Sequence, residues 1–170
     1  MDPMSSAGQV AVVVFDVNET LSDIEPVREV FTAAGLSGDL LDTWFASTLR
    51  DGFALAAAGT SAPFRVVGAG ALRFLVAGRP DLDVERLVSD VLERFASLEV
   101  HSDVVAGLRV LAEAGRRVVT LSNGAATVAE RLLERAGVAE LVELRLSVDD
   151  AGFWKPHPAS YGYAAQRCGV

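Results

Sequence analysis

The order of hydrophobic and polar residues predicts a chain in which buried strands alternate with amphipathic helices. Residues 9–15 read QVAVVVF, an uninterrupted run of the kind found in strands buried on both faces of a parallel sheet. Similar runs occur at 116–123 (RRVVTLSN) and 141–148 (LVELRLSV), and helical patterns precede them at 102–115 and 125–137. This strand–helix–strand order is typical of a doubly wound α/β core with a parallel sheet.

Residues 26–99 have a different pattern, rich in Ala and Leu at helical spacing. Breaks at GLSGD, AAAGTSAP and AGRPDLD divide this stretch into about four helices. Asp83 is expected to cap the helix that follows it. The pattern therefore predicts an α/β core formed by residues 1–23 and 100–170, with residues 24–99 inserted as a helical cap.

Composition and charge narrow the class of protein. The chain has 170 residues, 51% of them hydrophobic, which is enough for one domain with a substantial core. A formal net charge of -8 argues against a protein that binds nucleic-acid backbones. Cys168 is the only cysteine, which excludes an internal disulfide and favours a reducing cytoplasm. The first apolar run ends at Asp16 and is too short to span a membrane.

Polar residues follow the ends of the predicted strands. Asp16 ends the first strand, Ser122 and Asn123 end the second, and Lys155 follows the third, before a helix that Pro158 can begin. Ligands bind beyond the carboxyl ends of parallel strands, and the N–H groups at a helix start favour an anion. Each residue alone is more often a cap, a turn residue or a solvated charge. Their joint order along the chain favours one shared site.

These stretches resemble the motifs of the haloacid dehalogenase-like hydrolases. FDVNETL (15–21) is similar to the nucleophile motif, TLSNG (120–124) to the second motif and WKPHPASY (154–161) to the third, with a helical cap between the first two. Within the superfamily the likeness is strongest to the (S)-2-haloacid dehalogenases, which have similar SNG and KP stretches and a downstream Tyr. The resemblance implies a Rossmann-like core with a cap, and a hydrolase that removes halide from short 2-haloacids.

The second residue after the nucleophile separates two activities. Phosphatases of this superfamily carry a second Asp there, which protonates the leaving alcohol, whereas this chain has Asn18. An amide cannot act as a general acid, and a halide needs no proton to leave. Attack by a carboxylate at a saturated carbon, followed by ester hydrolysis, is covalent catalysis that needs one acid only. An Asn in this position is alternatively a turn-forming residue.

The chemistry and the resemblance together assign roles to the site residues. Asp16 is the expected nucleophile, and Lys155 favours its charged form. Ser122 is expected to hydrogen-bond the nucleophile or the substrate carboxylate. The resemblance adds substrate-binding residues at Thr20, Asn18, Asn123 and Tyr161. Packing of Tyr161 on the core is an equally good interpretation. We expect Asp16, Ser122 and Lys155 around one pocket between core and cap, with the ammonium within about 4 Å of the carboxylate.

Two features differ from the family pattern. The family carries a cap arginine that contacts substrate and halide, whereas Phe45 stands in the corresponding position here. Arg50 lies five residues further on, which turns it to another side of the helix. The sequence also stops after the third motif, before the strand with the acidic fourth motif. We therefore expect a fragment of a longer protein, with the C-terminal part of the core missing and the first strand at an open sheet edge.

Three interpretations follow from the sequence. The first is a 2-haloacid dehalogenase whose partner is a small 2-halocarboxylate, without cofactor or metal, because Lys155 can offset the charge of Asp16. A magnesium-dependent phosphatase and a non-catalytic dehalogenase-like binding protein are the alternatives. Halide release, compared with magnesium-dependent phosphate release, separates the first two. A homodimer is a further expectation.

Overall fold

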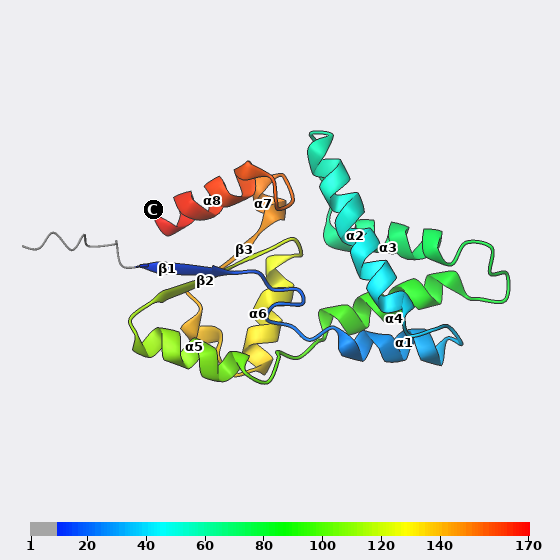
Figure 1. The fold of residues 1–170 in the computed structure, drawn as a ribbon, viewed down its shortest axis with the longest axis horizontal. Helices are drawn as coiled ribbons and strands as arrows, with labels where there is room; N and C mark the ends of the chain where they lie inside the picture. Colours follow the sequence, from blue (N-terminus) through cyan, green and yellow to red (C-terminus); the bar gives the residue numbers. More distant parts are fainter. Residues whose placement is uncertain (1–9) are drawn as a thin grey trace, which may run out of the picture.

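The computed structural model describes residues 10–170 and shows a parallel sheet beside a bundle of helices (Figure 1). The sheet has three strands in the order β1-β2-β3. Their bounds are β1 (Val12–Phe15), β2 (Arg117–Ser122) and β3 (Leu144–Ser147). The register pairs Phe15 with Thr120 and Ser122 with Ser147, so the three carboxyl ends lie at the same edge. The predicted α/β class with a parallel sheet is confirmed.

The central strand and the first strand differ in burial. Residues 118–122 of β2 are buried, whereas Val14 of β1 is 45% exposed. Within residues 10–170, β1 pairs only with β2 and its other side is free. Among the described residues, the expected open sheet edge at the first strand is confirmed. The prediction that its apolar run is buried on both faces is wrong, since Val14 is exposed. Gln9, the first residue of that run, lies outside the described residues.

Helices cover both faces of the sheet. α5 (Val104–Glu113) and α6 (Ala126–Arg135) lie below the sheet in Figure 1, and α7 (Val148–Ala151) and α8 (Pro158–Cys168) lie above it. The lower face is packed by a cluster that includes Leu108, Val118 and Leu132. This layering orients the carboxyl ends of the strands toward the cap.

The third strand is shorter than the predicted run. A 3-10 turn, η2 (Ala139–Leu141), occupies its first part, and the Glu143 N–H donates to the Val118 carbonyl at 2.8 Å before the strand begins at Leu144. After β3, the Ser147 hydroxyl accepts a hydrogen bond from the Asp149 N–H and begins the short helix α7. The sequence pattern did not predict α7, because a helix of four residues has no periodicity to read.

The inserted segment forms four α-helices, as predicted. They follow a 3-10 turn, η1 (Glu25–Val27), and are α1 (Arg28–Ala33), α2 (Leu40–Ala57), α3 (Phe64–Leu75) and α4 (Val84–Ala96). Asp83 caps α4 as expected, since its carboxylate accepts from the Arg86 N–H at 3.0 Å.

Trp44 forms the centre of the cap. Its side chain is fully buried, and its ring meets Phe64 and Phe95 edge-on with centroids 6.4 and 5.6 Å away. The indole N–H donates to the Gly68 carbonyl at 2.9 Å. Edge-to-face aromatic contacts of this kind stabilise packing beyond their buried area, so the cap has its own aromatic core.

The chain passes between core and cap through two short segments that touch each other. The Asp23 N–H donates to the Glu99 carbonyl at 3.0 Å, and the His101 N–H donates to the Leu21 carbonyl at 2.9 Å. The first segment follows the carboxyl end of β1, and the second precedes α5. The cap is therefore tethered close to the edge of the sheet at which the strands end (Figure 1).

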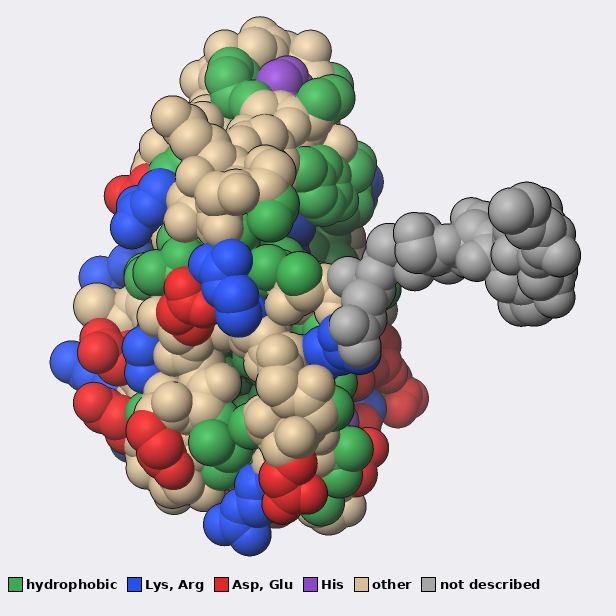
Figure 2. All heavy atoms as spheres, turned by 90° about the vertical axis from the view of Figure 1, so that its left-hand side faces the viewer, with side chains coloured by type: hydrophobic (Ala, Val, Ile, Leu, Met, Phe, Trp, Pro, Cys, Tyr) green, Lys and Arg blue, Asp and Glu red, His purple; other side chains and the backbone are tan. Residues whose placement is uncertain are grey.

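Charges are mixed on the exposed face of the core. Figure 2 shows Lys and Arg interspersed with Asp, Glu and hydrophobic side chains, without a basic stripe on that face. Among the helices of residues 10–170, none combines the length and the apolar character needed to cross a membrane.

Candidate active site

Asp16 and Lys155 meet at the carboxyl end of β1. The Lys155 ammonium lies 2.6 Å from Oδ1 of Asp16, which confirms the predicted ion pair. Nζ of Lys155 also donates to the Leu121 carbonyl of β2. On the other carboxylate oxygen, the Thr20 hydroxyl donates to Oδ2 of Asp16 at 3.3 Å. Both oxygens of Asp16 thus accept a hydrogen bond, one of them from a cation.

The loop after β1 turns back so that Thr20 can reach Asp16. The N–H groups of Leu21 and Ser22 both donate to the Val17 carbonyl, at 2.9 and 3.0 Å. Glu19 takes a left-handed backbone conformation with φ 65°, which an ordinary residue adopts only where the surrounding structure holds it. Burial raises the pKa of the Glu19 carboxyl, and the charge of His101 opposes this shift.

Asn123 fixes the backbone of Lys155. Its Oδ1 accepts from the Lys155 N–H at 2.9 Å, and its amide nitrogen donates to the Lys155 carbonyl at 3.5 Å. Asn123 is 6% exposed, so both contacts are shielded from water. The side chain that was predicted to bind substrate therefore connects the end of β2 to the segment that carries Lys155.

Ser122 is buried and turned toward the start of the next loop. Its hydroxyl accepts from the Gly124 N–H at 2.9 Å. A cavity of about 400 Å³ lies between β1 and α8, and Asp16, Lys155 and Tyr161 line it, but Ser122 does not. The prediction that Asp16, Ser122 and Lys155 surround one pocket between core and cap is therefore wrong in part. The cation and carboxylate are together as predicted, while Ser122 holds the loop behind them.

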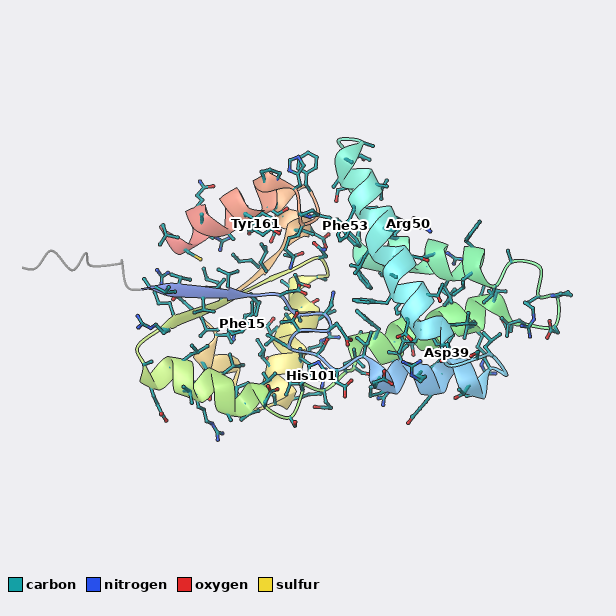
Figure 3. The ribbon with its side chains drawn as sticks, viewed as in Figure 1. Phe15, Asp39, Arg50, Phe53, His101 and Tyr161 are labelled. Carbon is teal, nitrogen blue, oxygen red and sulfur yellow. The ribbon has the colours of Figure 1, made fainter. Side chains whose placement is uncertain are left out.

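Tyr161 stands on α8 at the rim of this cavity and is 51% exposed (Figure 3). This exposure does not agree with packing on the core, the second interpretation of this residue. Asn18 lines a different cleft, between core and cap, together with Gly124. Asp16, Lys155 and Tyr161 thus line a cavity along β1 and α8, whereas Asn18 lines the cleft between core and cap.

Neither Arg50 nor Phe45 reaches Asp16. Arg50 lies on the side of α2 turned away from the core in Figure 3, is 65% exposed and pairs with the adjacent Asp51 at 2.8 Å. Phe45 packs inside the cap, with its ring 6.2 Å from that of Phe95. The expectation that Arg50 points to another side of the helix agrees with this arrangement.

Trp154 joins core to cap, a role that the sequence patterns did not reveal. Its indole N–H donates to the Ala62 carbonyl at 2.9 Å, and its ring stacks on Phe64 at 5.8 Å. Gly52 of α2 lies directly against it, since a Cβ at this position would stand 2.1 Å from the Trp154 ring. A glycine inside the helical pattern of α2 was the available signal, because it marks a close approach. Lys155 and Trp154 are adjacent in sequence, but Lys155 pairs with Asp16 of the core whereas Trp154 contacts the cap.

The described donor atoms do not form a magnesium site. Residues 10–170 contain no group of three or more His, Cys, Asp or Glu side chains that could hold a metal ion. Beside Asp16, the charge is matched by Lys155. This donor set does not fit Mg²⁺, which prefers several oxygen ligands in a near-octahedral arrangement.

Comparison with known proteins identifies the family. The haloacid dehalogenase-like hydrolase family matches residues 10–170. An (S)-2-haloacid dehalogenase of Xanthobacter autotrophicus is 29% identical over 93% of this chain and 62% of its own length. A second (S)-2-haloacid dehalogenase, from Pseudomonas sp. (strain CBS-3), is 26% identical over the whole chain and 73% of its own length. This chain thus spans only 62% and 73% of the lengths of these two relatives.

Solved structures agree with the sequence relatives. An L-2-haloacid dehalogenase superposes with a TM-score of 0.86 at 29% identity, covering 96% of this chain and 74% of that chain. The Xanthobacter autotrophicus enzyme with chloropropionic acid covalently bound superposes with a TM-score of 0.84 at 27% identity, covering 95% and 66%. With the family matching from Val10 to Val170, the chain belongs to the haloacid dehalogenase-like hydrolases.

Proposed function

We propose that this chain supplies the core and cap of a hydrolytic dehalogenase that acts on short 2-halocarboxylates through an aspartyl ester. The observation that carries the proposal is the ion pair between Lys155 and Asp16 at 2.6 Å, with the amide of Asn18 where a phosphatase needs a second acid. The named relatives support the substrate class, since one of them holds chloropropionic acid covalently.

The reaction has two steps that balance without a cofactor. In the first, a carboxylate oxygen of Asp16 forms a bond to C2 of the substrate while the carbon–halogen bond breaks and halide leaves with the electron pair. In the second, water attacks the ester carbonyl and gives the 2-hydroxy acid, a proton and the free carboxylate. Lys155 stabilises the carboxylate charge before attack and after hydrolysis, and Thr20 orients it through Oδ2.

The remaining site residues position these groups and the substrate. We propose that Ser122 holds the loop at Gly124 so that backbone N–H groups at the start of α6 face the substrate carboxylate. Tyr161 lines the cavity beside Asp16 and Lys155 and is proposed to contact the substrate there. Asn18 and Asn123 are the remaining proposed substrate-binding residues. Asn123 acts through its hydrogen bond to the backbone of Lys155.

The proposal also covers the domain organisation, the cellular location and the oligomeric state of the protein. Core residues 1–23 and 100–170 and cap residues 24–99 are supported by the two crossing segments at Asp23–Glu99 and Leu21–His101. The single buried thiol of Cys168 and the net charge of -8 support a cytoplasmic enzyme of small molecules rather than a nucleic-acid partner. A homodimer is proposed from the resemblance, and light scattering coupled to size-exclusion chromatography tests it.

Halide release from (S)-2-chloropropanoate tests the activity, and isotope labelling tests the mechanism. A single turnover in H₂¹⁸O is expected to place one ¹⁸O atom in the peptide that contains Asp16, because water attacks the ester carbonyl rather than C2. Label found only in the product would contradict the covalent mechanism. EDTA is expected to leave the rate unchanged, since Lys155 supplies the positive charge at Asp16.

Phosphoester substrates provide the contrasting measurement. Phosphate release from p-nitrophenyl phosphate that depends on Mg²⁺, without halide release from any 2-haloacid, would contradict the proposal and favour a phosphatase. Absence of both activities, with 2-hydroxypropanoate still bound, would favour a binding protein.

A further inference from the structure

Trp154 belongs to the core by its place in the sequence and to the cap by the contacts of its side chain. It directly precedes Lys155, between α7 and α8, and its indole is fully buried. The indole N–H donates to the Ala62 carbonyl at 2.9 Å, and the ring stacks on Phe64 with the two planes 8° apart. Gly52 leaves the space for the ring, because a Cβ there would overlap it. These contacts fix both the position and the angle of the indole.

The core holds the backbone on either side of the indole. The Lys155 N–H donates to Oδ1 of Asn123 at 2.9 Å. The Trp154 carbonyl accepts from the N–H of His157, the residue that caps α8, at 2.9 Å. The segment that carries the ammonium of Lys155 is therefore held at three points. Two of them, the end of β2 and the start of α8, belong to the core, and the third is the indole in the cap.

The ion pair at the end of β1 depends on how well this segment is held. The side chain of Lys155 is 14% exposed and that of Asp16 is 41% exposed, so water reaches the carboxylate. Ordering a long lysine side chain costs conformational entropy, and an ion pair open to water contributes little unless its geometry is fixed. A misplacement of about 1 Å can lower a rate by about 10²-fold. An anchor beside Lys155 thus favours the geometry in which ammonium and carboxylate meet.

Trp44 provides an internal comparison. Both tryptophans of the sequence are fully buried, and each donates its indole N–H to a backbone carbonyl at 2.9 Å. Each ring also contacts Phe64. The hydrogen bond of Trp44 stays within the cap, because its acceptor is the Gly68 carbonyl of α3. The two residues therefore make the same kinds of contact, and of the two only Trp154 connects them to the segment of Lys155.

We infer that Trp154 is a positioning residue, whose indole in the cap holds the ammonium of Lys155 against Asp16. The inference rests on the proposed function, because the ion pair that carries the proposed chemistry is the group that Trp154 positions. Loss of the indole is then expected to disturb Lys155 more than the accompanying loss of stability explains.

The first test does not depend on turnover. Lys155 is the only lysine in the sequence, so the full chain labelled with ¹⁵N-lysine gives one backbone amide signal. That N–H is bonded to Asn123, and its hydrogen exchange under native conditions reports how firmly the segment is held. Trp154→Phe keeps a ring but lacks the indole N–H, and exchange at Lys155 is expected to become about tenfold faster. Trp44→Phe is the matched control and is expected to change this rate less than about twofold.

Two further measurements keep the comparison decisive. Trp154→Leu removes the stacked ring as well and is expected to speed exchange further, and circular dichroism shows which variants remain folded. Trp44→Phe leaves Trp154 as the sole tryptophan, so weak quenching of its fluorescence by acrylamide verifies that the control keeps the indole buried. Equal exchange rates at Lys155 in Trp44→Phe and in the folded Trp154 variants would overturn the inference and leave Trp154 with a packing role.

Turnover separates this inference from the proposed function. In halide release from (S)-2-chloropropanoate, Trp154→Phe is expected to lower kcat about tenfold and to change KM less than about twofold. Trp44→Phe is expected to keep kcat within about twofold of the unmodified chain. Equal losses of kcat in the two variants, or a rise in KM alone, overturn the positioning role and retain the dehalogenase. Faster exchange at Lys155 in Trp154→Phe, in a protein that releases no halide, retains the positioning role and contradicts the dehalogenase.

Discussion

The core and the cap face each other across the cleft with different kinds of side chain. The core contributes charged and amide groups that are already bonded, chiefly Asp16, Asn123 and Lys155. The cap contributes the stacked rings of Phe64 and Phe95. Its Arg50 on α2 points away from the core, although Arg65 and Glu93 of the cap also line the cleft. From this difference we propose that the chemistry resides in the core, whereas the cap provides shape and excludes water. Changes in the core should then affect turnover, and changes in the cap should affect binding or stability.

Asp16→Asn is the strongest test of that division. The variant keeps the shape of the side chain but removes the nucleophile and its charge, so halide release is expected to fall on the order of 10⁴-fold or more. The fold, followed by circular dichroism, is expected to be unchanged. Asp150→Asn, an exposed carboxylate on α7, is the matched control and should keep full activity. Undiminished release by Asp16→Asn, with mass spectrometry excluding deamidation, would show that the core does not carry the chemistry.

Asn123→Ala tests whether the core acts through pre-positioned groups. Loss of the 2.9 Å bond to the Lys155 N–H frees the segment that carries the ammonium, and kcat is expected to fall by about 10²-fold, the cost of a small misplacement. KM should change less, because the cleft is untouched. Asn123→Asp keeps an oxygen acceptor for the same N–H and is expected to recover part of the rate. An increase in KM with unchanged kcat would instead favour direct substrate binding by Asn123.

The sequence predicted the ion pair of the core better than the contacts between core and cap, and the reason is physical. Asp16 and Lys155 follow strands, and a parallel sheet brings the ends of its strands together whatever the details of packing. Ser122 was placed in the same pocket because a position at a strand end does not fix the direction of a hydroxyl. That hydroxyl accepts from the Gly124 N–H, and Ser122 does not line the cavity.

The contacts between core and cap depend on shape, which a periodic pattern does not encode. Trp154 was visible in the third motif, but its place against Gly52 and Phe64 depends on how α2 and α3 cross the core. The cleft beside Asn18 was likewise unpredictable, since its lining comes from three helices far apart in sequence. The open edge at β1 was expected, but the strand pattern, an uninterrupted apolar run, could not reveal that Val14 stays exposed there.

Gly52→Ala tests the cap side of the comparison. The added methyl would stand 2.1 Å from the Trp154 ring, so the cap and core must separate or the indole must move. We expect a loss of about 1–3 kcal/mol in the free energy of unfolding, typical of overpacking, measured by urea denaturation. Gly70→Ala in α3 is the matched control. No heavy atom lies within 4 Å of its Cβ position, and it is expected to stabilise by up to about 1 kcal/mol. Equal effects of the two substitutions would show that Trp154 does not join cap to core.

The smallest expected effect distinguishes two arginine–carboxylate pairs, one in each part of the molecule. Arg117 and Glu143 pair at 2.7 Å in the core, and Arg73 and Glu85 pair at 2.7 Å in the cap. Hydrogen bonds from the arginines lower the pKa of both carboxyls below the usual 4.5. A lowered folded-state pKa gives stability that is present above pH 4.5 and is lost as the pH falls through the folded value.

Glu143→Gln and Glu85→Gln should therefore lower the unfolding midpoint slightly at neutral pH and not in acid. The effect should be larger for Glu143, because its side chain is 45% exposed against 70% for Glu85 and Arg117 also donates to the Cys168 carbonyl. The difference is measured by thermal unfolding of both variants at neutral pH and below pH 4.5. A larger fall in the unfolding midpoint for Glu85→Gln than for Glu143→Gln would contradict this prediction.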